Sequence, residues 1–422
     1  MGSVTLRLNF VVPLIFLILV LSAPQAVCSQ PCAEETLTEQ IDCLPLDLAS
    51  VVPPSSNAAP EDPTLIPDWF KSDSGIAVSP VYYGEVFTNA HGGIATNGST
   101  QYEGLLDLTV DLDFEKMKLD IPGRASILFQ NTHGRSLDAY VGATQVISNI
   151  DSFNNIAQIS ELWWEVGLYD SGVTMRVGKQ DISNLFITMD AAGDFINSAF
   201  GLSPSAGLPS FPTPSPAIVF MTEVNSDLSL RVGGWDAYRS NANGLFSDNN
   251  SALFIGELEY RYQSPFRQLP GKFTAGVTYQ TTGSVPAGTI PRALGYYVQI
   301  EQLLFREAGS TDDQPQGLTV FAQHFPTSTY GRSPFPLIPH DALAGLSYTG
   351  LIRGRDQDVT GAGAGWVELD QGGTNREIMV EVFYKAQIND TLSVQPDLQY
   401  ITTPSGIYPD AFVAGLRFQL DL

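Results

Sequence analysis

The chain has 422 residues, of which 45 are Asp or Glu and 21 are Lys or Arg, so its formal net charge is −24. This acidic excess argues against a nucleic-acid partner, because contacts to phosphates need a basic surface. Charged residues make up only 16% of the chain, against about 25% in soluble domains, so part of the surface is expected not to face water.

Residues 1–28 have the pattern of a secretory signal peptide. Arg7 is the only charged residue before Glu34, the apolar run FVVPLIFLILVL follows it, and small residues near Ala26 offer a cleavage site. The apolar run is shorter than the roughly 20 residues that a membrane-spanning helix needs. We therefore predict export with cleavage of this segment.

Residues 29–75 are predicted to form a Pro-rich periplasmic segment, with six prolines between 44 and 67. Cys32 and Cys43 remain after cleavage, and outside the cytoplasm such a pair can form a disulfide, which the sequence leaves open. The four histidines lie far apart and no cysteine cluster accompanies them. We therefore expect no metal site and no cofactor.

From residue 76 to residue 422 the side chains alternate between apolar and polar with a period of two, which indicates β-strands. In 376–389, for example, Ile378 and Val380 alternate with Glu377 and Glu381. Sixteen strands are predicted, at 77–90, 101–114, 124–131, 158–169, 172–179, 217–223, 227–236, 251–262, 271–280, 293–304, 317–325, 342–352, 360–370, 376–389, 391–402 and 411–422.

Three features favour a barrel in a membrane over a soluble sandwich. The strands are longer than the usual 5 or 6 residues, aromatic residues gather near strand ends, and the polar face carries full charges that a protein core would not tolerate unpaired. We therefore predict an all-β fold, a transmembrane antiparallel up-and-down β-barrel. The final strand, 411–422, is expected to pair with 77–90 and to close it.

The connections between the predicted strands support this topology. They average about 6 residues at one end of the barrel and about 16 at the other, as expected of short periplasmic turns and longer extracellular loops. An even number of strands places both ends of the chain on the periplasmic side. The longest outer connection is 180–216.

Several stretches resemble the carbohydrate-selective porins of the OprB type, in order and spacing over residues 75–422. They are ELWWEVGLYDSGVTMRVGKQD (161–181), FINSAFG (195–201), RDQDVTGAGAGW (355–366), EVFYKAQINDTLSVQPDLQYI (381–401) and AGLRFQLDL (414–422). The resemblance implies an outer-membrane barrel of a Gram-negative-type bacterium that passes small sugars by passive diffusion. Two features depart from it: the chain ends in Leu422, where many such barrels end in Phe, and the Pro-rich segment is not expected of the barrel itself.

The resemblance also implies partners, namely outer-membrane lipid, sugars as permeant solutes and the outer-membrane insertion machinery. Barrels with this strand number are often homotrimers. The sequence carries no trimer signature, so the oligomeric state stays open.

On each predicted strand, the residues that alternate with the apolar ones should point into the barrel. The charged residues at these inward positions are predicted to line the pore. They are Glu161, Glu165, Arg176, Arg231, Glu257, Glu259, Arg261, Glu377, Glu381, Lys385, Asp397 and Arg417. Sugar hydroxyls donate to carboxylates and accept from guanidinium groups, and the apolar faces of sugars could lie against Trp163, Tyr169 and Trp235, which also lie at inward positions. The alternative for each charged residue is a generic hydrated wall of paired charges.

The connection 180–216 is expected to fold into the barrel and narrow it, with Asp181, Asp190, Asp194 and Asn197 among its polar residues. The alternative is a surface lid or a loop that faces a partner.

Two further functions remain open at this stage: a porin that passes mainly cations or other small hydrophilic solutes, and a secreted soluble β-protein that binds or cleaves glycans. Glu161 and Glu165 lie four residues apart on one strand, roughly 13 Å, which exceeds the separation of a glycosidase carboxylate pair. The GAGAG run at 361–365 lacks the Lys-Ser/Thr of a phosphate-binding loop. We therefore do not expect an enzyme.

Overall fold

The computed structural model describes residues 74–168, 171–204, 207–237, 251–265, 267–285, 288–290, 292–310, 316–330, 338–369 and 374–422. The predicted signal peptide, the pair Cys32 and Cys43, and Tyr169 lie outside these residues, as does the Pro-rich segment up to residue 73.

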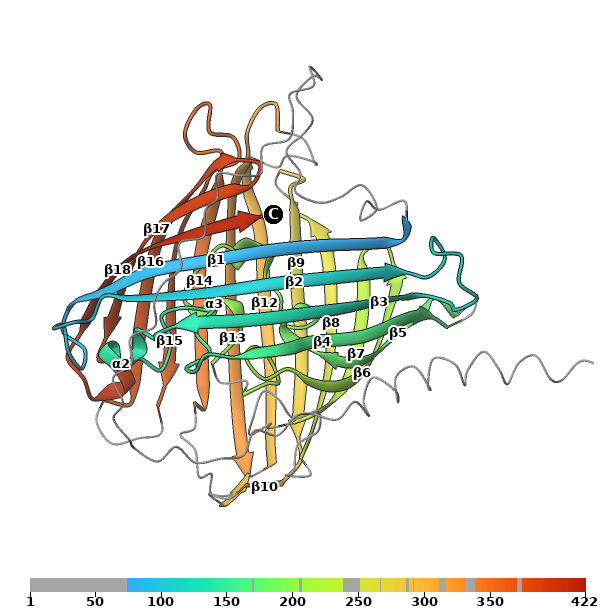
Figure 1. Ribbon diagram of the computed structural model, residues 1–422, viewed down its shortest axis with the longest axis horizontal. Helices are drawn as coiled ribbons and strands as arrows, with labels where there is room; N and C mark the ends of the chain where they lie inside the picture. Colours follow the sequence, from blue (N-terminus) through green and yellow to red (C-terminus); the bar gives the residue numbers. More distant parts are fainter. Residues whose placement is uncertain are drawn as a thin grey trace, which may run out of the picture. The chain divides into compact units, whose positions relative to one another are not determined.

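Within the described residues, sixteen strands form a closed antiparallel barrel in which each strand pairs with its neighbours in chain order (Figure 1). The strands are β1 (Ile76–His91), β2 (Gln101–Asp113), β3 (Arg124–Gly134), β4 (Ala157–Gly167), β5 (Val173–Gln180), β6 (Ser215–Asn225), β7 (Leu228–Asp236), β8 (Ala252–Gln263), β9 (Pro270–Gln280), β12 (Arg292–Arg306), β13 (Gly317–Tyr330), β14 (His340–Thr349), β15 (Val359–Glu368), β16 (Arg376–Asn389), β17 (Leu392–Thr402) and β18 (Ala411–Asp421).

The predicted fold and all sixteen predicted strands are confirmed. The largest boundary difference is in β13, which runs to Tyr330, where the pattern predicted an end at residue 325. Phe325 and Pro326 are both buried, so the alternation of buried and exposed side chains is interrupted at that point. A period-two pattern cannot follow a strand through such an interruption.

Smaller elements lie in the connections. The hairpin β10 (Gly283–Val285) and β11 (Gly288–Ile290) follows β9. The short helical elements are α2 (Asp138–Val141), η5 (Ile182–Asn184), η6 (Asp190–Ala192), α3 (Ser198–Gly201) and η7 (Pro404–Gly406). None of the helices in the described part of the chain has the length and apolar character needed to cross a membrane.

The last strand closes the barrel as predicted. β18 pairs with β1, with Val81 opposite Asp421 and Glu85 opposite Arg417. The N–H of Leu422 donates to the carbonyl of Pro80 at 3.0 Å. The end of the chain is therefore part of the sheet, which has no free edge in the closed ring.

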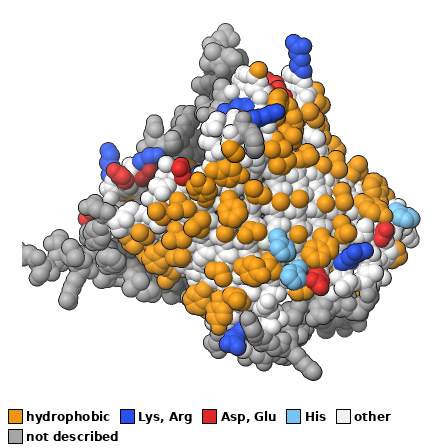
Figure 2. Space-filling model, turned by 180° about the vertical axis from the view of Figure 1, so that it is seen from behind, with side chains coloured by type: hydrophobic (Ala, Val, Ile, Leu, Met, Phe, Trp, Pro, Cys, Tyr) orange, Lys and Arg blue, Asp and Glu red, His pale blue; other side chains and the backbone are white. Residues whose placement is uncertain are grey.

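The two faces of the barrel have opposite character. On β18, Phe412 and Leu416 are 37% and 44% exposed on the outside, whereas Arg417 is buried on the inside at 8%. Hydrophobic side chains cover much of the face in Figure 2, and charged side chains lie mainly near its edges. This arrangement inverts that of a water-soluble protein and is typical of a barrel surrounded by lipid.

The connections differ in length between the two ends of the barrel. One end, which we call the loop end, carries residues 135–156 between β3 and β4 and residues 181–214 between β5 and β6. We call these two connections inner loop 1 and inner loop 2. The opposite end, the turn end, has short connections such as residues 226–227, and β18 finishes there.

Candidate functional site

Inner loop 2 is held against the inside of the barrel by three glutamates of the wall. Each accepts hydrogen bonds from main-chain N–H groups of the loop: Glu257 from Ile187 (2.8 Å), Glu301 from Ala191 (2.7 Å), and Glu381 from Ile196 (2.6 Å) and Asn197 (2.9 Å). An irregular segment inside a barrel has N–H groups that no neighbouring strand can satisfy, and leaving them unpaired is costly. Carboxylates satisfy them with charge-assisted bonds.

Two ion pairs add to this attachment. Lys272 of β9 lies 2.8 Å from Asp190, and Lys385 of β16 lies 2.8 Å from Asp194. Lys272 also lies 2.8 Å from Glu301. The loop is therefore fastened to strands on different parts of the wall.

Apolar packing fills the space between inner loop 2 and the wall. Phe195 packs against Phe321 and Phe383 with ring centroids 5.5 and 4.9 Å apart. The rings of Phe186 and Trp235 pack edge to face with their centroids 5.5 Å apart, and Trp235 is only 2% exposed. The expectation that a sugar stacks on Trp235 is therefore wrong, since the loop covers this ring.

The glycines of the GAGAG run make room for both inner loops on β15. A Cβ atom at Gly363 would lie 2.7 Å from the ring of Phe200 and 2.9 Å from that of Phe195. A Cβ atom at Gly365 would lie 2.3 Å from the side-chain oxygen of Gln145. These positions therefore need glycine because the loops approach the strand closely.

Inner loop 1 also folds into the barrel, which the sequence did not indicate. Glu377 of β16 accepts from the N–H groups of Thr144 and Gln145, both at 2.8 Å. Its apolar residues Val141 and Ile147 are buried. Apolar residues such as these indicate that the loop packs against something, but they do not show which strand it packs against.

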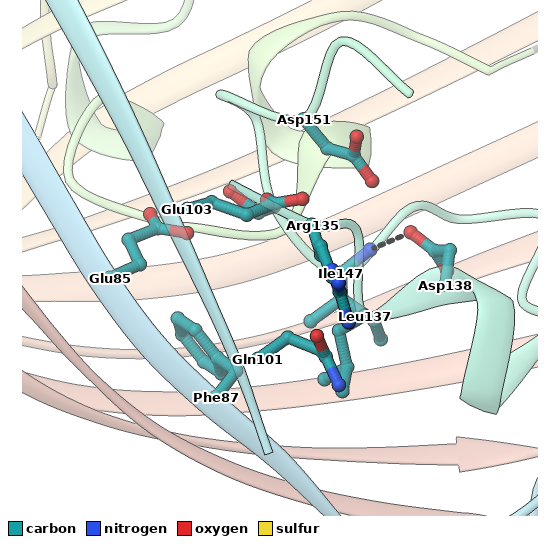
Figure 3. A pocket seen from close by; sticks show the side chains of 10 residues that line it. Glu85, Phe87, Gln101, Glu103, Arg135, Leu137, Asp138, Ile147 and Asp151 are labelled. Carbon is teal, nitrogen blue, oxygen red and sulfur yellow. Dashed lines mark hydrogen bonds between the residues drawn. The ribbon is translucent and has the colours of Figure 1, made fainter. Parts of the chain in front are cut away.

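A cluster of carboxyl groups lies where inner loop 1 meets the wall (Figure 3). Glu85 and Glu103 reach in from β1 and β2, and Asp138 and Asp151 come from the loop. Asp138 accepts from the N–H of Ile147 at 3.2 Å. Burial raises the pKa of Asp138 well above its usual range, and the nearby Asp151 adds to this. Burial also raises the pKa of Asp151.

This cluster is not a metal site by its geometry. Within the described residues, no group of three or more His, Cys, Asp or Glu is placed to hold a metal ion.

A cavity of about 840 Å³ remains between the two inner loops and the wall. Its lining is mixed: Ser, Asn and Gln side chains from the loops and the strands lie beside apolar side chains such as Leu105, Leu128 and Leu208. The charged side chains that line it are Asp107, Asp151, Glu161, Asp181, Asp194, Lys385 and Arg417. Five of these seven side chains carry carboxyl groups, and two carry basic groups.

The predicted site residues divide into groups. Glu161, Lys385 and Arg417 line the cavity, together with Asp181 and Asp194 of inner loop 2. Glu161 accepts from the indole N–H of Trp163 at 2.8 Å. Arg417 pairs with Glu85 and also donates to Asn149 of inner loop 1 at 2.6 Å.

A second group is buried beneath the loops. Glu257, Glu381 and Asp397 are 2%, 0% and 1% exposed. We expected these side chains to line the pore. The structure instead covers them, because the main chain of inner loop 2 takes Glu257 and Glu381 as acceptors. Asp397 accepts from Gln399 at 3.0 Å.

The other predicted residues form networks with one another. Arg176 pairs with Glu165 at 2.6 Å, and its guanidinium carbon lies 3.8 Å from the centre of the Trp163 ring. Arg124 of β3 also pairs with Glu165 at 2.7 Å. Two further wall groups are Arg231 with Glu257 (2.8 Å) and Glu259 (3.3 Å), and Arg261 with Glu259 (2.9 Å) and Glu223 (3.2 Å).

The last two predicted residues make contacts that hold inner loop 2 in place. Asp190 forms the ion pair with Lys272 described above. Asn197 is fully buried and its side chain accepts from the N–H of Ala199 at the start of α3. Neither lines the 840 Å³ cavity.

Sequence reasoning missed several wall residues that the structure brings into the site. They are Glu85, Glu103, Asp107, Lys272 and Glu301. The alternation along β1, β2, β9 and β12 could have identified these residues. They occupy the inward positions that alternate with apolar outward residues such as Val86, Phe273 and Ile300.

Comparison with known proteins gives a consistent result. The family model of the carbohydrate-selective porin, OprB family, matches residues 97–422. Porin B of Pseudomonas aeruginosa is 22% identical over 442 residues, covering 89% of this chain and 94% of that protein. The porin-like protein QuiX of Acinetobacter baylyi is 24% identical over 386 residues, covering 79% and 86%.

Solved structures share the fold. The structure of Pseudomonas putida OprB at high pH has a TM-score of 0.71 and 19% identity, and the match covers 83% of this chain and 95% of that one. The low-pH structure of the same protein has a TM-score of 0.56. With the family model matching most of the chain, the protein belongs to the OprB family of carbohydrate-selective porins.

Proposed function

We propose that this protein is an outer-membrane porin through which small neutral sugars diffuse passively. The observation that carries this proposal is the cavity of about 840 Å³ between the barrel wall and two anchored loops, whose lining carries both polar and apolar side chains. Its volume is within the range of roughly 300–1,000 Å³ that small-molecule sites occupy. Membership of a carbohydrate-selective family supports sugars as the solute.

The two inner loops set the width of the pathway in this proposal. A loop held only by weak contacts would move and let the pore width vary. Here Glu257, Glu301 and Glu381 bind the main chain of inner loop 2, and Glu377 binds that of inner loop 1. The pathway therefore keeps a defined narrow part, as selective diffusion requires.

Sugars would cross by exchanging hydrogen bonds with the lining. Their hydroxyls can donate to carboxylates such as Asp107 and Asp181 and accept from Lys385. No step of this process needs a catalytic group, and the porin family and barrel fold point to a channel rather than an enzyme.

The apolar exterior supports placement of the barrel in the outer membrane of a Gram-negative bacterium, with lipid around it. In this proposal the turn end faces the periplasm, residues 1–28 are removed during export, and residues 29–75 lie in the periplasm. The insertion machinery of the outer membrane would be its partner in assembly. A homotrimer is tested by measuring the mass of the folded protein in detergent.

A second candidate function is a porin for cations. The cavity lining has an excess of carboxylates over the two cations Lys385 and Arg417. Such a lining raises the local concentration of cations and lowers that of anions. It also disfavours anionic sugars and organic acids.

Recording from single channels in planar bilayers separates these candidates. If sugars are the cargo, glucose and maltose at millimolar concentration will reduce or slow the ion current. A current that sugars leave unchanged, together with strong preference for Na⁺ over Cl⁻, would replace the sugar proposal with the cation proposal. Heat-modifiable migration on a gel tests the membrane barrel itself, because a soluble glycan-binding protein would not show it.

A further inference from the structure

Phe153, near the end of inner loop 1 that leads into β4, is an exposed aromatic residue. It is 59% exposed, more than any aromatic side chain on the apolar exterior of the barrel in the described part of the chain. It lines the 840 Å³ cavity and also a second cavity of about 450 Å³. Because it lies between these cavities, its ring meets water rather than lipid, which is unfavourable for a hydrophobic group without a partner.

Hydrogen bonds hold the backbone at Phe153 in an unfavourable conformation. Phe153 has φ = +59°, the left-handed region that bulky residues avoid. Its N–H donates to Asp151 at 2.6 Å. On either side, Thr132 of β3 bonds the hydroxyl of Ser152 (2.7 Å) and the N–H of Ile156 (3.0 Å). The chain on both sides of Phe153 is therefore bonded to the wall.

Polar groups of the same loop line the cavity that Phe153 lines. Ser148, Asn149 and Asp151 of the loop line the cavity together with Phe153. A pyranose has an apolar face of C–H groups and a rim of hydroxyls. An aromatic ring beneath the face, with amide and carboxylate groups at the rim, complements both parts.

Two other aromatic rings line the large cavity, Tyr83 of β1 and Phe211 of inner loop 2. The guanidinium carbon of Arg417 lies 5.7 Å from the centre of the Tyr83 ring. One side of that ring thus faces a cation. Phe153 is the more exposed platform and is shared by both cavities.

We propose that Phe153 is a stacking platform for the apolar face of a pyranose, and that it gives the pore its preference for ring sugars over acyclic polyols. This inference rests on the proposed sugar-porin function. It predicts that the ring of Phe153 contributes to sugar binding and not to the open width of the channel.

The test compares block of the ion current by glucose and by sorbitol, an acyclic polyol of similar size, in wild-type protein and in Phe153→Ala. We expect Phe153→Ala to weaken glucose block about tenfold, to leave sorbitol unaffected, and to keep the open-channel current. Phe153→Tyr should retain glucose block. Phe129→Ala, which removes a ring 36% exposed on the outward face of β3, is the matched control and should change neither.

The outcomes separate the two proposals. Equal glucose block in wild type and in Phe153→Ala would overturn the platform and leave the sugar porin intact. Absence of glucose block in wild type would overturn both. Heat-modifiable migration of each variant establishes that it is folded before its current is compared.

Discussion

Glu381 is the residue whose replacement tests most directly how inner loop 2 is held. Its carboxylate is fully buried and accepts two main-chain N–H groups, from Ile196 at 2.6 Å and Asn197 at 2.9 Å. In Glu381→Gln one acceptor oxygen becomes an NH₂ group, which cannot accept from an N–H. One of the two loop N–H groups is then left buried without a partner.

The expected cost follows from these contacts. An unsatisfied buried N–H costs about 1–3 kcal/mol. We therefore expect the attachment of the loop to weaken by about 1–3 kcal/mol, which is roughly a 5- to 150-fold increase in the population of the detached loop.

Single-channel recording measures this change. Glu381→Gln should show a larger or noisier open current than wild type, because a detached loop widens the narrow part of the pathway. The matched control is Glu368→Gln, which removes a carboxylate of β15 that is 37% exposed and lies 4.0 Å from the Nε2 atom of His340. Currents from Glu381→Gln that match those of wild type and of this control would refute the role of Glu381 as an anchor.

Three other predictions follow from the fold and the inner loops. Leu416→Arg places a charge on the apolar exterior and should reduce the stability of the inserted barrel by about 2–4 kcal/mol near the middle of the bilayer. The folded fraction, read from gel migration, measures this loss. Leu416→Met is the control and should leave the folded fraction unchanged. Gly363→Val should displace Phe200, whose ring lies 2.7 Å from the position of a Cβ atom, and should increase the conductance; an unchanged current would contradict the close packing. Burial raises the pKa of Asp138, so its contribution to loop packing is complete below a pH of about 4 and is lost as pH rises through the raised pKa. Conductance of wild type should therefore rise with pH, and Asp138→Asn should flatten this dependence.

The strands and their faces could be predicted because they depend on local order. Alternation of residues such as Val380, Glu381 and Val382 states which side chain points inward, whatever the rest of the chain does. The pairing of β18 with β1 also followed, since a sheet whose strands all have an apolar outer face must close to leave no edge in lipid. Length alone indicated that inner loop 2 was unusual.

The identity of the loop contacts could not be predicted in the same way. Glu381 and Lys385 are both inward residues of one strand, yet Glu381 is buried under the loop and Lys385 lines the cavity. Whether inner loop 2 covers Glu381 or Lys385 depends on where the main-chain N–H groups of the loop lie in the folded barrel. Trp235 was misassigned for the same reason.

The sequence by itself determined the barrel: the number of strands, the inward and outward face of each, and the closing pair. The tertiary structure decided the pathway: inner loop 1 folds inward beside inner loop 2, the GAGAG glycines make room for both, and wall glutamates bind their main chains. The physical reason is the separation along the chain of the residues that interact. Strand alternation is set by neighbouring residues, whereas a pore of this kind is shaped by contacts between segments that can be more than 200 residues apart, such as Gln145 and Glu377.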